Sequence, residues 1–366
     1  MNGASQRALK GLAFGAILAG QLWGNSISTV LGTGVAGFSG DGGAASEARI
    51  RGPFGVIVGP DGSLYVCDTY NHCIRKVDKG GIVSTVAGVG GKKGYSGDGG
   101  QAVKALLNEP YEVRFDKKGD LYFVEMMNHL IRKVDMKTGL VSTLAGTGEK
   151  GFGGDGGQAK MAKFNRPHSI QFGPDGDLYV CDIGNHRIRK VSMRTGKVST
   201  FCGTGKRMKT KDGGEISKVH LNGPRAIDVS GDQMWLALRE GNAVYRLDLS
   251  KGTIHHEAGT GKRGFSGNGG PAKSATLSGP KGIALGPRGN VYLADTESHS
   301  VRMIDRATGK LELIAGDGKA GDGPEGGDPR KCRMDRLHGI YVDTDGAIYI
   351  GDTNTHRIRV IRPRSQ

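Results

Sequence analysis

The sequence predicts an all-β fold in which six four-stranded sheets form a closed ring, a six-bladed β-propeller. A glycine that ends a short apolar run recurs at intervals of 56 to 58 residues, at Gly32, Gly88, Gly146, Gly203, Gly259 and Gly316. A second marker is the residue that closes an LYVCD-like run, which recurs at intervals of 56 or 57 residues. It is an acid at Asp68, Glu125, Asp182, Asp295 and Asp352, and a leucine, Leu238, in the fourth copy. Two independent markers therefore agree on six copies of one unit, which is typical of a propeller.

Each copy contains four short runs rich in β-branched and aromatic residues. In the third copy we expect strands at 169–172, 178–181, 187–191 and 198–201. Pro174-Asp175-Gly176 predicts a tight turn, because proline presets φ and glycine accepts positive φ. Four antiparallel strands without long intervening helices make one blade.

The ends of the repeat array predict how the ring closes. The sixth copy contains three strands, near 340–342, 347–350 and 357–361. Its missing fourth strand is expected from residues 27–31, so that a segment early in the chain completes the last blade. Closure of this kind leaves only short, protected sheet edges.

A glycine-rich loop of the form GFSGDGG precedes each new first strand. Its polar residue is Asp41, Asp98, Asp155 or Asn268. We expect this residue to N-cap a short helical turn and the preceding aromatic residue to pack as a plug. The loop lacks the acid spacing of an EF-hand and the Lys-Ser/Thr of a P-loop, which favours a structural role.

The element NHxIRKV occurs at 71–77, 128–134 and 185–191. Together with the P-x-G-V and LYVxD elements, it closely resembles the NHL-repeat family of six-bladed propellers. The resemblance extends from Ile27 to the C-terminus. It implies the fold but not the function, because this scaffold hosts enzymes, protein-binding domains and RNA-binding domains.

Residues 1–26 differ from the rest in composition. Arg7 and Lys10 precede the apolar run 11–20, and no acid occurs before Asp41. This pattern predicts a secretory signal and a secreted or periplasmic propeller over 27–366, with organelle import as the alternative. The apolar run is too short to span a bilayer.

The five cysteines do not indicate a disulfide framework or a cysteine zinc site. Cys67 and Cys181 occupy equivalent positions where side chains pack between sheets, and no CxxC occurs. Cys67 and Cys73 lie on adjacent predicted strands, so a bond between them is left open.

The net charge of +15 favours an anionic partner. Much of this charge is periodic, in Arg75-Lys76, Arg132-Lys133 and Arg189-Lys190. Adjacent strand residues point to opposite faces, so we expect one of each pair to lie between sheets near an acid. RNA binding is therefore an alternative rather than the first hypothesis, and we expect a monomer unless the propeller joins a larger assembly.

The channel mouth is the best place for function. In a propeller the first strand of each sheet lines the central channel, and the residue after its leading proline lies at the mouth. These positions hold Phe54, Tyr111, His168, Arg225, Lys281 and His338, the last following Leu337. The acids and Asn-His histidines repeat in nearly every copy, so structure explains them, whereas the mouth residues differ in every copy.

The contexts of His168 and His338 resemble those of the zinc histidines in the NHL-type propeller of peptidyl-hydroxyglycine amidating lyase. That resemblance implies catalytic roles for His168, His338, Tyr70 and Arg239. This chain departs from the pattern, because the alternate blades carry Phe54 and Lys281 in place of histidines. A single divalent metal, Zn or Ca, would need His168 and His338 with Asp182 or Asp352.

The fourth copy is irregular. The basic run 206–211 replaces the GFSG loop, and Leu238 replaces the acid beside Arg239. An anion pocket and a drifted repeat are both consistent with this. We expect a binding scaffold that takes an anionic or peptide ligand through Arg225, Arg239, Lys281, Tyr111 and Phe54, with a metal-dependent lyase or hydrolase as the alternative.

Overall fold

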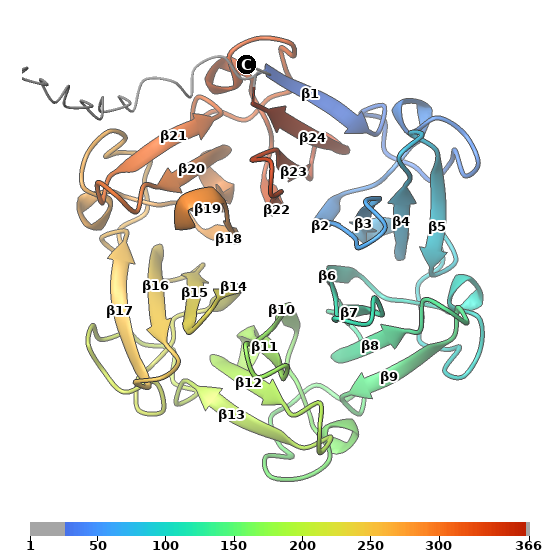
Figure 1. Ribbon diagram of the computed structural model, residues 1–366, viewed down its shortest axis with the longest axis horizontal. Helices are drawn as coiled ribbons and strands as arrows, with labels where there is room; N and C mark the ends of the chain where they lie inside the picture. Colours follow the sequence, from blue (N-terminus) through green and yellow to red (C-terminus); the bar gives the residue numbers. More distant parts are fainter. Residues whose placement is uncertain (1–25, 364–366) are drawn as a thin grey trace, which may run out of the picture.

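The computed structural model describes residues 26–363, and these form a six-bladed β-propeller (Figure 1). The sheets, numbered here as blades 1 to 6, each contain four antiparallel strands. Blade 1 contains β2 (Pro53–Val58), β3 (Leu64–Asp68), β4 (Cys73–Val77) and β5 (Val83–Ala87). Blade 2 contains β6 (Pro110–Phe115), β7 (Leu121–Glu125), β8 (Leu130–Val134) and β9 (Val141–Ala145). Blade 3 contains β10 (Pro167–Phe172), β11 (Leu178–Asp182), β12 (Arg187–Val191) and β13 (Val198–Cys202).

The second half of the ring follows the same order. Blade 4 contains β14 (Pro224–Ser230), β15 (Gln233–Leu238), β16 (Ala243–Asp248) and β17 (Thr253–Ala258). Blade 5 contains β18 (Pro280–Leu285), β19 (Val291–Asp295), β20 (Ser300–Ile304) and β21 (Leu311–Ala315). Blade 6 contains β22 (Leu337–Val342), β23 (Ile348–Asp352), β24 (Arg357–Arg362) and β1 (Ser26–Leu31).

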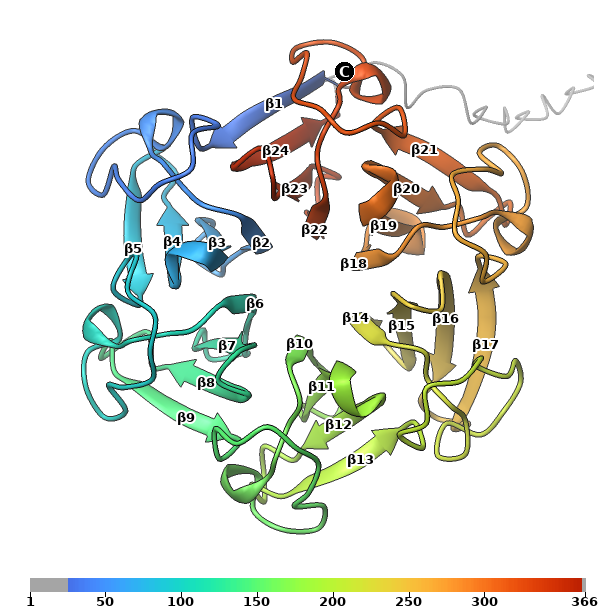
Figure 2. The same ribbon diagram turned by 180° about the vertical axis from the view of Figure 1, so that it is seen from behind.

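The predicted closure of the ring is confirmed. β1 pairs antiparallel with β24, with Ile27 opposite Ile361 and Leu31 opposite Ile358. Figures 1 and 2 show β1 as the outermost strand of the last blade, with the first strands β2, β6, β10, β14, β18 and β22 innermost. The strand begins at Ser26, one residue before the predicted start, and residues 1–25 of the predicted targeting segment 1–26 lie outside the described residues.

Single 3₁₀ turns are the only helical elements within residues 26–363. They are η1 (Ala45–Glu47), η2 (Thr69–Asn71), η3 (Ala102–Lys104), η4 (Ala159–Met161), η5 (Ile183–Asn185), η6 (Ala272–Ser274), η7 (Pro287–Gly289), η8 (Thr296–Ser298) and η9 (Pro329–Lys331). In the described part of the chain, none of these turns has the length or apolarity to cross a bilayer.

The loop acid does not cap the helical turn in the loops that have the GFSGDGG form, so that prediction was wrong. The N-cap of η1 is Ala44, which makes no side-chain cap bond. Asp41 instead accepts hydrogen bonds from Arg75 at 2.7 Å and from the hydroxyl of Thr85 at 2.7 Å. A fully buried guanidinium outcompetes backbone amides that water can reach, because a buried charge without a partner is very costly.

A buried arginine cluster organises the interior of five blades. The arginine of the third strand lies between the acid that ends the second strand and an acid or asparagine of the preceding glycine loop. These arginines are Arg75, Arg132, Arg189, Arg302 and Arg359, all with no exposed surface. In blades 1 to 3 the next residue is a partly exposed lysine, as Lys76 is in its ion pair with Asp61 at 2.7 Å, whereas Met303 and Val360 are buried at this position in blades 5 and 6. The predicted division of the Arg-Lys pairs between interior and surface is confirmed.

The cysteines are buried and unbonded. Cys67, Cys73, Cys181, Cys202 and Cys332 are all free. Burial raises the pKa of Cys67 and Cys181. Both act as small apolar core residues between the sheets, and Cys67 and Cys73 do not pair.

Candidate functional site

Six side chains, one from the first strand of each blade, gather at the centre of the ring. They are the predicted mouth residues Phe54, Tyr111, His168, Arg225, Lys281 and His338. In each blade the pairing of the first strand with the second is interrupted just after the leading residue, as between Pro167 and Ile170. An irregularity of this kind re-aims a side chain out of the sheet, here toward the other blades.

The mouth residues form a packed plug. The Phe54 ring stacks on His338 with centroids 4.1 Å apart and meets the edge of Tyr111 at 4.9 Å. Tyr111 contacts His168 edge-on at 4.4 Å, and its hydroxyl accepts a hydrogen bond from Arg225 Nε at 2.9 Å. The cavity beneath this plug measures about 20 Å³, roughly the space of one water molecule. A ligand on this face therefore meets the plug rather than an open channel.

His168 is neutral and has one free nitrogen. Its Nδ1 lies 2.6 Å from the carbonyl oxygen of Arg166 and must donate, because a carbonyl only accepts. Its buried Nε2 has no partner among the described residues. Burial, and then the charge of Arg225, lower the pKa of His168 well below its usual value. The free lone pair can accept a proton, a hydrogen bond or a metal.

His338 is also neutral, but both of its nitrogens are engaged. Nδ1 lies 2.9 Å from the Arg336 carbonyl oxygen and 2.9 Å from Thr353 Oγ1, and Nε2 lies 3.2 Å from Lys281 Nζ. Burial and the charge of Lys281 lower its pKa well below the usual value. Its lone pair is therefore taken by Lys281.

Cations gather around one carboxylate beside the plug. Glu297 Oε1 accepts from Lys281 Nζ at 3.0 Å and from Arg336 at 2.8 Å, and Arg239 lies 3.9 Å away. Burial, and then the charge of Arg225, lower the pKa of Lys281 to about 7. One carboxylate cannot neutralise this group, so the sector retains positive charge.

The sequence analysis missed Arg336 and Glu297. Arg336 directly precedes the mouth strand and has φ of +54°, a strained conformation for a residue other than glycine. Its backbone N–H donates to Nδ1 of His299 at 3.2 Å. His129 accepts from Arg166 in the same way. These repeated histidines thus hold adjacent blades together, and the position before each mouth strand was the available signal.

The predicted acids lie inside the blades. Asp182 accepts from the Asn165 amide and Asn185 Nδ2, both at 2.7 Å, and lies 3.4 Å from Arg189. Asp352 accepts from Arg359 at 2.7 Å. No group of three or more His, Cys, Asp or Glu within residues 26–363 is placed to hold a metal ion. A metal at His168, His338 and Asp182 stays a prediction, and it would need Lys281 and Arg189 to be displaced.

Tyr70 follows β3 of blade 1 and Arg239 follows β15 of blade 4, two blades that lie on opposite sides of the ring (Figure 2). The Tyr70 ring is half-exposed and contacts Phe54 at 5.4 Å. Arg239 pairs with Glu240 at 2.5 Å. The plug separates the two side chains, so the structure does not bring the four predicted catalytic residues to one point.

Comparison with known proteins agrees with the fold and the repeat. A Teneurin NHL domain family matches residues 33–94 and 147–192, and the NHL repeat family matches 277–302 and 334–361. NHL repeat-containing protein 2 of Gallus gallus is 26% identical over 331 residues, covering 81% of this chain and 44% of that protein. Protein SUPPRESSOR OF QUENCHING 1, chloroplastic, of Arabidopsis thaliana is 27% identical over 285 residues, covering 75% and 26%. The chain spans less than half the length of these relatives.

Solved structures share the architecture at low identity. An auxiliary nutrient binding protein of Bacteroides ovatus superposes with a TM-score of 0.67 at 17% identity, covering 94% of this chain and 78% of that one. The family matches, the six blades and the closing strand β1 lead to one conclusion. The chain is an NHL-repeat six-bladed β-propeller.

Proposed function

We propose that this chain is a binding propeller whose channel face takes the anionic group of a small molecule or peptide in the sector of Arg225, Arg239 and Lys281. The observation that carries the proposal is the charge balance of this sector. Glu297 is shared by Lys281 and Arg336, Glu240 pairs with Arg239, and Arg225 bonds Tyr111 without an ion pair to any described residue, so the cations outnumber the carboxylates. Arg239 and Arg336, whose side chains are 34% and 42% exposed, can bind a carboxylate or phosphate group through charge-assisted hydrogen bonds. Lys281, Tyr111 and Phe54 are buried in the plug beside them, where Lys281 adds positive charge.

RNA binding is less favoured as the role of this basic chain. The repeated arginines that raise its charge lie inside the blades with acids, as Arg132 does with Glu125 at 2.9 Å. Such residues cannot contact phosphates. The apolar run at 11–20 supports export of the propeller, and the bacterial protein of the same fold is named for a binding role.

We expect titration calorimetry with citrate to detect this site. Arg239→Ala and Arg336→Ala should each weaken citrate binding about 10- to 100-fold, because a hydrogen bond to a charged group contributes about 1.5–3 kcal/mol. Lys118→Ala is the matched control, because Lys118 is an exposed cation in the β6–β7 turn, at the far end of the blade from the mouth. Equal affinity in wild type and both arginine variants would refute the site.

The affinity for sulfate should depend on pH through Lys281, and sulfate replaces citrate here because citrate loses its own last proton in the same interval. The Lys281 pKa of about 7 leaves it charged at pH 6 and mostly neutral at pH 8, so sulfate affinity should fall across this interval. The groups that face Lys281 are Arg225, Glu297, Arg336 and His338. His338 is neutral throughout because its pKa is well below the usual value. Lys281→Met should remove the pH dependence, and an unchanged slope in that variant would contradict the assignment.

A second candidate function, acid–base or metal-assisted lyase or hydrolase chemistry, is favoured by the free Nε2 of His168. Elemental analysis of untagged protein beside His168→Ala/His338→Ala tests the metal form of this hypothesis. About one equivalent of Zn or Ca, lost in the double variant, would support it. Equal metal content in the two proteins, including none in either, would exclude it.

A further inference from the structure

In four blades a partly exposed aromatic ring covers the buried arginine. The guanidinium carbons lie 4.7 to 5.3 Å from the ring centroids in Arg75–Phe38, Arg132–Tyr95, Arg189–Phe152 and Arg302–Phe265. The acid that ends the second strand lies seven residues before each arginine and pairs with it. The arginine is therefore held by a cation–π pair and an ion pair.

Blade 4 replaces most members of this cluster. Tyr245 stands in place of the arginine, and Leu238, seven residues earlier, stands in place of the acid. The loop of blade 4 keeps an acid, Asp212, at the position of Asp41. The next residue shows the equivalence, because Gly213 donates its backbone N–H to the Ile254 carbonyl as Gly42 does to the Val83 carbonyl. Three residues before that acid, Lys209 occupies the position of the aromatic ring.

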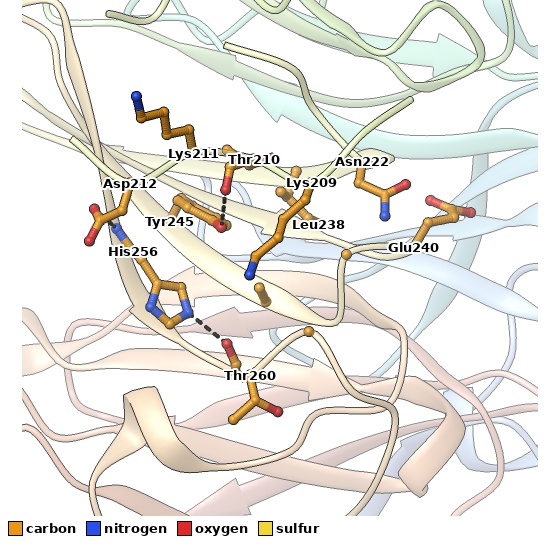
Figure 3. A pocket seen from close by; sticks show the side chains of 14 residues that line it. Lys209, Thr210, Lys211, Asp212, Asn222, Leu238, Glu240, Tyr245, His256 and Thr260 are labelled. Atoms are coloured by element: carbon orange, nitrogen blue, oxygen red, sulfur yellow. Dashed lines mark hydrogen bonds between the residues drawn. The ribbon is translucent and has the colours of Figure 1, made fainter. Parts of the chain in front are cut away.

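The substitutions leave a cavity of about 660 Å³ at this place. Its walls include Leu238, Ala243 and the rings of Tyr245 and His256, whose centroids lie 5.3 Å apart. Cavities of about 300–1,000 Å³ with apolar walls and a few polar groups are typical of small-molecule sites. In Figure 3 the Lys209 side chain extends into this space, whereas Lys211 points away from it.

The charges around the cavity are not balanced. Glu240 is paired with Arg239, and Asp212, which accepts the His256 backbone N–H at 2.8 Å, is the only other carboxylate of the lining, set against two lysines, Lys209 and Lys211. The ammonium of Lys209 has no ion pair with any residue of the described chain. The Tyr245 hydroxyl donates to the Thr210 carbonyl at 2.9 Å, and His256 Nε2 donates to the Gly259 carbonyl at 2.6 Å, so both wall rings are held in place.

We propose that this cavity binds a small organic anion with a planar aromatic ring, such as an aromatic carboxylate. The ligand's ring takes the place that an aromatic side chain occupies in the four regular blades, against Tyr245 and His256. Its carboxylate pairs with Lys209, and the Asn222 amide and Thr260 hydroxyl lie on the same lining. This site goes beyond the proposed function, because it uses neither Arg225 nor Lys281 and lies within one blade.

The test is calorimetric titration with indole-3-acetate and with tryptamine, which present the same ring with opposite charge. Indole-3-acetate should bind at least about tenfold more tightly, the equivalent of about 1.4 kcal/mol. Lys209→Phe restores the regular repeat, removes the ammonium and fills the space, so it should abolish binding. Lys206→Phe is the matched control, because Lys206 is an exposed lysine of the same loop that does not line the cavity, and it should leave the affinity within about twofold.

The outcomes separate this proposal from the channel-face site. Arg336→Ala should weaken citrate binding and leave indole-3-acetate binding unchanged, while Lys209→Phe should do the reverse. Lys209 lies exposed on a loop, so its replacement should not lower the unfolding midpoint. No binding of indole-3-acetate at about 1 mM, equal affinity for tryptamine, or full affinity in Lys209→Phe would each overturn the proposal.

Discussion

Replacing Arg132 by methionine should lower the free energy of unfolding by about 3–5 kcal/mol, the usual effect of removing one partner from a buried ion pair. Arg132 has no exposed side-chain surface and bridges Glu125 at 2.9 Å and Asp98 at 2.6 Å. Burial already raises the pKa of Glu125 to about 7 in the presence of the arginine. Without it, the carboxyl must take up a proton or remain as an unpaired buried charge. Denaturant unfolding at pH 7 measures the loss.

Two further variants test the cause. Lys133→Met, at the next residue, removes a partly exposed ion pair with Asp120 and a contact with the Tyr122 ring, and should change stability by only about 1 kcal/mol. Glu125→Leu/Arg132→Tyr copies the residues that blade 4 uses at 238 and 245, and should recover most of the loss because an apolar pair replaces an ionic one. A double variant as unstable as Arg132→Met would contradict this account.

Gly339→Ala should destabilise the protein by about 3 kcal/mol through overpacking at the centre of the ring. A β-carbon on Gly339 would lie 2.0 Å from the carbonyl oxygen of Phe54 in the next blade. Backbone cannot yield as a flexible side chain can, so blades 1 and 6 must separate. As blades 1 and 6 separate, the rings of Phe54 and His338 should move apart and lose part of their stacking contact.

Gly327→Ala is the matched control for that substitution. A β-carbon there meets nothing within 4 Å, and its φ is not in the positive range. We expect the control to be within about 0.5 kcal/mol of wild type. Equal unfolding midpoints for the two variants would show that close blade contact at Gly339 does not limit stability.

Sequence reasoning was most successful where one unit repeats. The spacing of Gly32 and its equivalents fixes six blades, and the three strands of the last copy require β1. The same periodicity identified the mouth residues, because position within a first strand determines which side chain faces the axis. The N-cap role of Asp41 was wrong because the buried Arg75, 34 residues later, is the stronger partner.

The other features of the candidate sites depend on contacts between blades, which the repeat pattern does not encode. Arg225 in blade 4 bonds Tyr111 in blade 2, and Glu297 collects cations from three separate segments. In the sequence, Leu238 marks the fourth copy as irregular, and the prediction drawn from it was an anion pocket at the channel mouth. Only the packing of Tyr245 and Lys209 reveals that the replaced cluster leaves a cavity.

The pairing of β1 with β24 also governs the order in which the protein can assemble on the ribosome. Blades 1 to 5 are each built from consecutive strands, so each can form soon after its residues emerge. Blade 6 cannot, because its outer strand is synthesised first and must wait for residues 357–362. Until then β1 is an unpaired edge, and its capture closes a loop of over 300 residues. Ring closure is therefore the last step of assembly, and β1 is the strand that waits longest for its partner.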